Sequence, residues 1–199
     1  MDADMSLDEF SEFVFSACLV NDADPVASWC EYRDRQARYV DFLNGKKRVD
    51  LRGANFDLSM SIEGRTFLNS HGRRNFPDGE IYTGPVEESV EGWIRYSYPA
   101  IHQGREVSGI ELKFEGGKVV KATAQKNEEY LNKVLDPDPG ARFLGEFAIG
   151  TNYGINRFSR NILFDEKIGG TVHLAVGRAY EDTGAKNKSA VHWDMIAGA

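Results

Sequence analysis

The chain has 199 residues and a formal net charge of −7 at pH 7; its length suits one domain or one domain with a small helical extension, and its acidity argues against nucleic acid as the main partner. No apolar run reaches the roughly 18 residues that a membrane-spanning helix needs, so we expect no membrane partner. The two cysteines, Cys18 and Cys30, lie in predicted helices, which favours buried free thiols in a reducing cytoplasm over a disulfide framework or a cysteine-based metal site.

Two helices are predicted at the start of the chain. A Ser-x-x-Glu capping box predicts the first over residues 6–20. A proline in the first turn predicts the second over residues 25–43, where an Asn-Gly pair would end it. We interpret residues 1–45 as a helical hairpin that packs without chemistry of its own, and residues 46–199 as a β-rich domain that forms one compact unit with it.

Beyond the hairpin the apolar residues alternate, which is typical of strands with one buried face. The two glycines between Glu115 and Lys118 indicate a two-residue hairpin turn. Residues 99–104 are predicted to form a turn and residues 128–135 a short helix. The expected strands cover residues 56–62, 66–68, 90–98, 107–114, 118–124 and 141–149. The predicted fold class is therefore α+β: an N-terminal helical hairpin followed by a mostly antiparallel β-rich domain with a few helices.

The segment from residue 161 to residue 196 holds two of the four histidines, together with carboxylates, a tyrosine and several glycines. The spacing of its apolar residues predicts a helix over residues 165–180, with a strand over residues 171–176 as the alternative. On that helix Glu166, His173 and Tyr180 would share one face. An acid, an imidazole and a phenol would then be close together.

A strand is predicted over residues 189–196, where His192 and Asp194 point to the same side. Imidazole and carboxylate are ligands of zinc and similar divalent metals. A lone histidine or a single His-x-Asp is more often structural. The metal-site hypothesis therefore depends on the coincidence of these groups in one short segment.

A loop rich in turn residues precedes Glu80, and loops of this kind often carry functional side chains. Arg73 and Arg74 in this loop fit either a site for a substrate carboxylate or a surface pair that balances Asp78. We favour the surface pair.

Four separated motifs resemble the M29 family of dinuclear metal aminopeptidases. They are GRRNFPDGEIYTGP, ARFLGEFAIGTNYGI, FDEKIGGTVHLAVGRAY and SAVHWDMI, and they occur in the family's order. The resemblance covers about residues 6–196. It is a resemblance to the catalytic half alone, because family members carry a further N-terminal domain and continue beyond the last motif.

The resemblance implies a site for two divalent ions, Zn²⁺, Co²⁺, Mn²⁺ or Mg²⁺. Its implied ligands are Glu80, Glu146, His173, His192 and Asp194. Three carboxylates would offset most of the charge of two such ions, and no thiolate is involved.

The resemblance also implies two catalytic residues: Tyr180 as a donor to the oxyanion and Glu166 as a proton acceptor. The implied reaction removes the N-terminal residue from peptides with a free N-terminus, carried out by a cytoplasmic homodimer. The alternative is a truncated, non-catalytic remnant that binds metal or forms dimers. A purely structural β-rich binding domain would bind no metal.

Overall fold

The computed structural model describes residues 4–198, which form two five-stranded antiparallel sheets and one two-stranded ribbon. Sheet A has the order β1 (Arg48–Gly53), β2 (Phe56–Ser61), β5 (Glu91–Arg95), β8 (Glu111–Glu115), β9 (Lys118–Thr123). Sheet B has the order β12 (His192–Ala197), β11 (Val172–Gly177), β10 (Leu144–Gly150), β4 (Glu80–Thr83), β3 (Leu68–Ser70). The ribbon pairs β6 (Ala100–His102) with β7 (Arg105–Val107).

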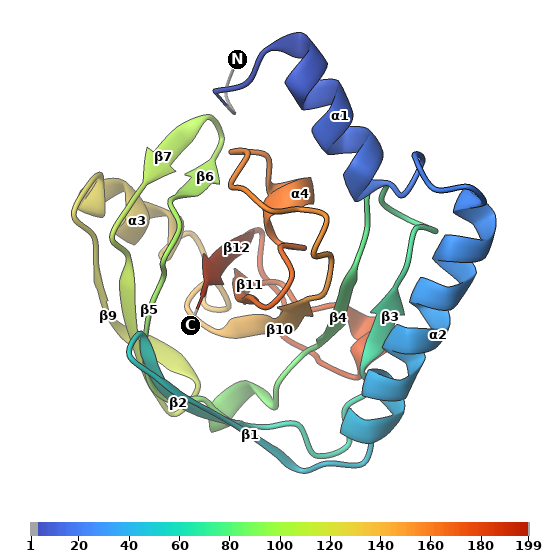
Figure 1. Ribbon diagram of the computed structural model, residues 1–199. Coiled ribbons are helices and arrows are strands. Elements are labelled where there is room, and N and C mark those ends of the chain that lie inside the picture. The colour runs from blue at the N-terminus through green and yellow to red at the C-terminus, as the bar shows by residue number, and fades with distance from the viewer. Residues whose placement is uncertain (1–3, 199) are drawn as a thin grey trace.

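The main hydrophobic core lies between the two sheets. Figure 1 shows sheet A curving along one side of the molecule and sheet B crossing its centre. Each sheet turns an apolar face to the other, because alternate side chains of an antiparallel strand share a face. The core residues include Leu58, Leu112 and Phe114 from sheet A and Phe147, Leu174 and Val176 from sheet B.

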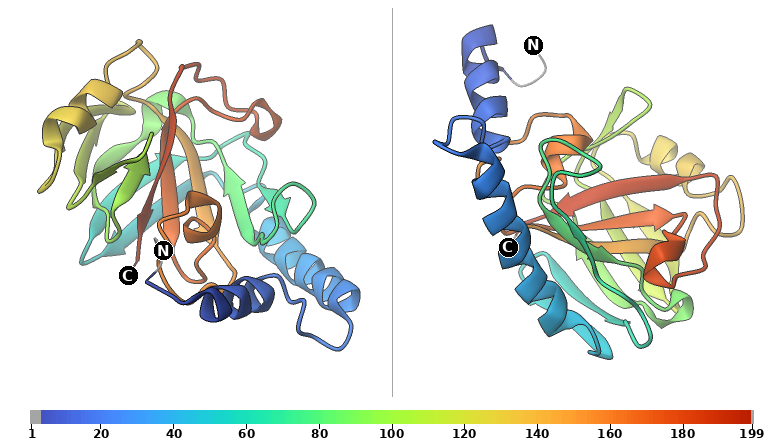
Figure 2. Two further views of the ribbon diagram at one scale, coloured as in Figure 1. Left: turned by 90° about the horizontal axis from the view of Figure 1, so that it is seen from above. Right: turned by 90° about the vertical axis from the view of Figure 1, so that its right-hand side faces the viewer.

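Four helices border the sheets in the described part of the chain: α1 (Leu7–Ala17), α2 (Pro25–Leu43), α3 (Glu128–Val134) and α4 (Ile162–Asp165). The predicted capping box begins α1: the Ser6 and Glu9 side chains each accept a hydrogen bond from the other residue's backbone N–H. Helix α2 runs along β3 and β4 (Figures 1 and 2). Short 3₁₀ turns cover Glu87–Ser89 and Glu181–Thr183.

Helix α2 is joined to sheet B by buried polar groups. The Gln36 side chain is fully buried and donates to the Asn69 side chain, at 2.6 Å, and to the Ser70 carbonyl, at 2.8 Å. The Tyr32 hydroxyl lies 2.9 Å from the Thr151 hydroxyl. The division of the chain at residue 45 stays a prediction.

The helix predicted over residues 165–180 is wrong, and the strand alternative is correct. Helix α4 ends at Asp165, and β11 pairs with β10 on one side and β12 on the other. The β-branched Val172 and Val176 favour a strand. Hydrogen bonds to strands on both sides stabilise the extended form more than the helical spacing of the apolar residues favours a helix.

Other differences have local causes. Strand β1 was not predicted, because four of its six residues are exposed and most are charged or glycine. The turn predicted over residues 99–104 is the β6–β7 hairpin. Cys18 is buried as predicted, but Cys30 is exposed, and both thiols are free. The predicted bounds of α2 and the hairpin joining β8 to β9 are confirmed. No helix in residues 4–198 is both long and apolar enough to cross a membrane.

A β-bulge in β10 decides which face of sheet B carries Glu146. Leu144 pairs with Val176, but Glu146 pairs with Ala175, so Gly145 is the extra residue. Without the bulge, Leu144 and Glu146 would point to the same face. The bulge leaves the leucine in the core and turns the carboxylate to the opposite face.

We expect Gly145→Ala to destabilise the fold. A Cβ at Gly145 would lie 2.4 Å from the Gly177 carbonyl oxygen and 2.5 Å from that of Arg178, and backbone atoms cannot rotate away. Overpacking of this kind costs about 2 kcal/mol, which lowers Tm by about 4 °C or more in a chain of this size. Thermal unfolding checks this. The control is Gly198→Ala, whose Cβ meets nothing closer than Tyr98 at 3.9 Å; equal Tm values for the two variants would contradict the argument.

Candidate metal centre

The face of sheet B that is turned away from the core carries the predicted ligands. Glu80 begins β4, Glu146 lies in β10, His173 in β11, and His192 and Asp194 in β12. Their cross-strand neighbours on this face are small: Ala175 pairs with both Glu146 and Asp194, Gly177 with His192, and Ala148 with His173. These small residues leave room for the five longer side chains to converge.

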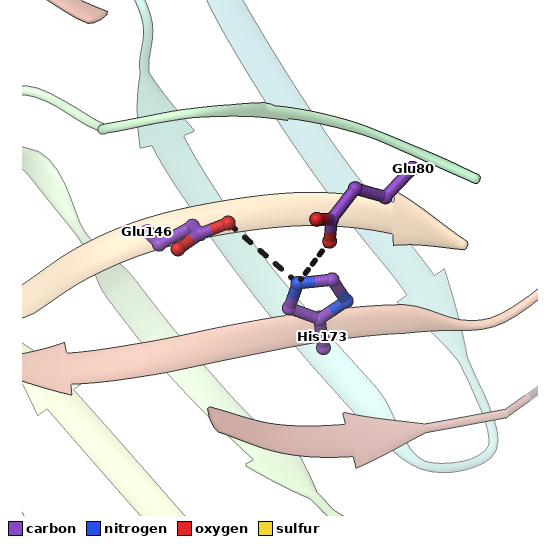
Figure 3. A group of neighbouring side chains, drawn as sticks. All are labelled: Glu80, Glu146 and His173. Carbon is purple, nitrogen blue, oxygen red and sulfur yellow. Dashed lines mark ion pairs between the residues drawn. The ribbon is translucent and has the colours of Figure 1, made fainter. Parts of the chain in front are cut away.

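The five side chains meet around Glu146. The Nε2 atom of His173 lies 3.2 Å from Glu80 Oε2 and 3.6 Å from Glu146 Oε1 (Figure 3). The Nε2 atom of His192 lies 3.3 Å from Glu146 Oε2 and 3.5 Å from Asp194 Oδ1. The two oxygens of Glu146 therefore face different histidines. Residues spread over more than a hundred positions of sequence form one cluster.

Three groups of donors in this cluster have the geometry to hold a cation, with one ligand atom per residue and all atoms within 4.8 Å of one another. The first is Glu80, Glu146 and His173, and the second is Glu146, His192 and Asp194. These two share only Glu146. One carboxylate that serves two donor groups is the arrangement by which a pair of divalent ions is bridged. The third group is Glu166, His173 and Asp194.

Unpaired polar atoms indicate that the cluster fits cations. Glu80 Oε2 is buried and accepts no hydrogen bond from any residue between 4 and 198, since His173 approaches it outside hydrogen-bonding geometry. His192 Nδ1 lies 2.7 Å from the Arg178 carbonyl oxygen, to which it can donate only as N–H. A neutral His192 would then direct its Nε2 lone pair at two carboxylates. A cation between them would turn this repulsion into ligation.

The carboxylates hold protons on both histidines when no metal competes. Burial alone would lower the pKa of His192, but Asp194 and Glu146 outweigh it and raise that pKa to about 11. Burial of His173 is likewise outweighed by Glu146 and Glu80, so its pKa lies well above the usual value. Both shifts have one cause, which is an excess of negative charge in a buried site. Bound metal would take the place of these protons.

Glu166 and Tyr180 also reach the cluster. Glu166 follows α4, and its burial, with the charges of Glu80 and Asp194, raises its pKa to about 8. A carboxyl group that titrates near neutral pH suits general acid–base chemistry. The Tyr180 ring is partly exposed to solvent and lies 5.0 Å from the His192 ring. Burial and then the neighbouring carboxylates raise the pKa of the Tyr180 hydroxyl, which keeps its proton.

A cavity of about 210 Å³ opens over the cluster. Two of its lining residues were missed from the sequence, Ser70 and Tyr82. Tyr82 shares a face of β4 with Glu80, so the two-residue period of a strand was a usable signal. Arg74 and Asn75 lie at this cavity, and Arg74 approaches Asp182 to 3.5 Å.

The predicted pairing of Arg73 and Arg74 with Asp78 is wrong. The Asp78 carboxylate is fully buried and accepts hydrogen bonds from the backbone N–H of Gly72, at 2.6 Å, and of Gly79, at 2.8 Å. Asp78 therefore fixes the loop that leads into Glu80. Its charge is satisfied by these backbone donors and by the Ser70 hydroxyl, 3.1 Å from Asp78 Oδ2, and not by the arginines.

A further charged group near the cluster gave no signal in the sequence. Lys167 is fully buried; its ammonium forms an ion pair with Glu166 and lies 3.7 Å from Glu80 Oε1. Burial alone would lower its pKa, but Glu80 and Glu166 outweigh that effect and raise it. Lysine is almost never fully buried without a partner, so a single sequence gives no reason to place it here.

Comparisons with known proteins show which family the chain resembles. The profile of the family described as "Thermophilic metalloprotease (M29)" matches residues 1–199. Aminopeptidase T of Thermus aquaticus is 34% identical over 94% of this chain and 52% of its own length. Aminopeptidase 2 of Geobacillus stearothermophilus is 32% identical over 98% of this chain and 54% of its own length. The chain thus spans about half the length of the curated relatives it matches.

Solved structures share the fold. Wild-type AmpT from Thermus thermophilus superposes with a TM-score of 0.80 and 32% identity, over 94% of this chain and 51% of that one. A 2,5-dihydroxypyridine dioxygenase from Pseudomonas putida KT2440 has a TM-score of 0.71 over 84% of this chain and 54% of that one, but at 17% identity it shows the fold alone. The α+β fold and the family resemblance are confirmed: the chain belongs to the M29 family of thermophilic metalloproteases.

Proposed function

We propose that this chain is the catalytic part of a metal-dependent aminopeptidase that removes the N-terminal residue from peptides at a dinuclear centre. The observation that carries the proposal is Glu146, whose two oxygens face two donor groups on neighbouring strands. The similar proteins described above support it, because they are aminopeptidases. Membership of a metalloprotease family supports a role for divalent ions.

The proposed ligands divide into two sets that share Glu146. One ion would be held by Glu80, Glu146 and His173, and the other by Glu146, His192 and Asp194. Two imidazoles and three carboxylates favour Zn²⁺ or Co²⁺, with Mn²⁺ or Mg²⁺ as harder alternatives. Two such ions would supply an acidic water and polarise the scissile carbonyl.

The protein groups complete the chemistry. Glu166 accepts the proton released when water attacks, in its carboxylate form, which becomes the major form above its pKa of about 8. The protonated Tyr180 hydroxyl donates to the oxygen that becomes negative. The acidic cavity wall would attract the free amine of a substrate, so we expect cleavage to require a free N-terminus. We further infer a cytoplasmic homodimer, supported by the family resemblance and the two free thiols.

We expect about two divalent ions per chain after loading with Zn²⁺ or Co²⁺, and loss of hydrolysis when a chelator removes them. Elemental analysis before and after chelation, with hydrolysis of a leucyl peptide, measures both quantities. The N-acetylated peptide is the control and should not be cleaved. A loaded chain that binds no ion contradicts the proposal. Two ions without hydrolysis of the free peptide would favour the non-catalytic remnant.

Replacing Glu146 should weaken the binding of both ions, because it is shared by both donor groups. We expect Glu146→Gln to lower metal content from about two ions to below one while the chain stays folded, since the amide keeps the shape of the side chain. The matched control is Glu63→Gln, at an exposed surface ion pair with Lys47. A Glu146→Gln variant with full metal content would show that the ligand assignment is wrong.

Tyr180→Phe should lower kcat by about 10²–10³, the typical cost of losing one donor to an oxyanion. Metal content should not change, because the hydroxyl is not a proposed ligand. Steady-state kinetics and elemental analysis of the same preparation separate the two effects. Tyr39→Phe, at an exposed position of α2, is the control. An unchanged kcat in Tyr180→Phe would remove this residue from the mechanism.

A further inference from the structure

Lys167 is a buried charged group beside the centre that the proposed mechanism does not use. Its side chain has no exposed surface, and its ammonium pairs with Glu166 and lies 3.7 Å from Glu80 Oε1. A buried charge is tolerated when it is paired and hydrogen-bonded. Both of its partners are carboxylates of the candidate metal centre, so its position bears on which carboxylates bind metal.

The cluster offers more carboxylates than two ions need. Glu166 forms a third donor group with His173 and Asp194, and each of these residues also belongs to one of the other groups. Glu166 in the coordination sphere would compete for these shared ligands. It would also become a weaker proton acceptor, because coordination to a cation lowers the basicity of a carboxylate. The centre therefore needs a means of keeping Glu166 away from the ions.

We propose that Lys167 is a positioning residue that holds Glu166 out of metal coordination, limits the centre to two ions and keeps Glu166 free to accept a proton. The inference rests on the proposed function. Of the four cluster carboxylates, Lys167 contacts Glu166 most closely and Glu80 at longer range, and it forms no ion pair with Glu146 or Asp194. The ammonium thus pairs with Glu166, the carboxylate that is not a ligand in the two-ion arrangement.

The charge of Lys167 has a second consequence. Two divalent ions would balance the four carboxylates Glu80, Glu146, Glu166 and Asp194, so the buried ammonium would leave one net positive charge beside the cavity. A net positive charge in a site of low dielectric favours an anionic oxygen there. The same charge repels metal ions, so Lys167 weakens metal binding and promotes the reaction. A purely structural lysine would instead strengthen both the fold and the metal site.

The test is zinc affinity, measured by competition with a chromophoric chelator on the full chain. We expect Lys167→Met to bind Zn²⁺ at least about tenfold more tightly and to lose at least about tenfold in kcat, since a repelling charge is gone and Glu166 is free to ligate. Lys167→Arg keeps the charge and should return the affinity toward that of the wild type. Lys113→Met makes the same charge change at an exposed ion pair and should leave zinc affinity unchanged.

A double-mutant cycle shows whether Lys167 acts through Glu166. In a Glu166→Gln background, Lys167→Met should gain clearly less affinity than in the wild type, because the extra carboxylate ligand is missing. Unchanged or weaker zinc binding in a folded Lys167→Met chain overturns the proposal. Full additivity in the cycle also overturns it.

A crystal structure of the zinc-loaded wild type keeps the proposal testable if Lys167→Met does not fold. We expect Glu166 to remain paired with the Lys167 ammonium, and a Zn–O bond of about 2.0–2.2 Å to Glu166 would overturn the inference.

The proposed function and the proposed role of Lys167 are contradicted by different results. Two bound ions without peptide hydrolysis contradict the aminopeptidase function alone, a zinc-ligated Glu166 in an active enzyme contradicts the role of Lys167 alone, and a chain that binds no zinc contradicts both.

Discussion

Repulsion between buried carboxylates is the constraint on which this structure depends. Glu80, Glu146, Glu166 and Asp194 converge on one face of sheet B, and the first three are less than a tenth exposed. Such a group of like charges is stable only with cations among them. The protein supplies positive charge through Lys167 and through protons on the two histidines. The raised pKa values of His173 and His192 result from the surrounding negative charge. Divalent ions would neutralise more of the carboxylate charge.

The rest of the fold holds these charges against their repulsion. The opposite face of sheet B packs on sheet A through Phe147, Leu174 and Val176, so the strands cannot move apart without exposing the core. Buried hydrogen bonds from Gln36 fix β3 from the side of α2, and Asp78 fixes the loop before Glu80. The two N-terminal helices have no group in the cluster, and they follow one another along the molecule instead of packing as a hairpin (Figure 2). Helix α2 nevertheless supports the strand that precedes the first carboxylate.

The comparison with a dioxygenase at a TM-score of 0.71 shows that this architecture is not tied to one reaction. A sheet with one apolar face and one polar face is a scaffold, and its chemistry is set by the side chains that the polar face presents. In this chain those are the two histidines and the carboxylates around Glu146, with Tyr180 and Glu166 beside them. The functional proposal therefore depends on the site and on family membership, and the fold contributes only the positions.

The sequence by itself determined the elements whose signals are local. The Ser6 capping box, the proline that opens α2 and the glycine pair after Glu115 each act within a few residues of chain, and all three were predicted correctly. Separated motifs also gave the family and a list of site residues. The tertiary structure decided what depends on distant partners. Strand β11 forms because β10 and β12 flank it, Glu146 faces the site because of the bulge at Gly145, and Lys167 is buried because Glu80 and Glu166 surround it. Cross-strand pairing and charge pairing join residues that are far apart in sequence. Such pairings therefore cannot be predicted from the residues of one segment alone.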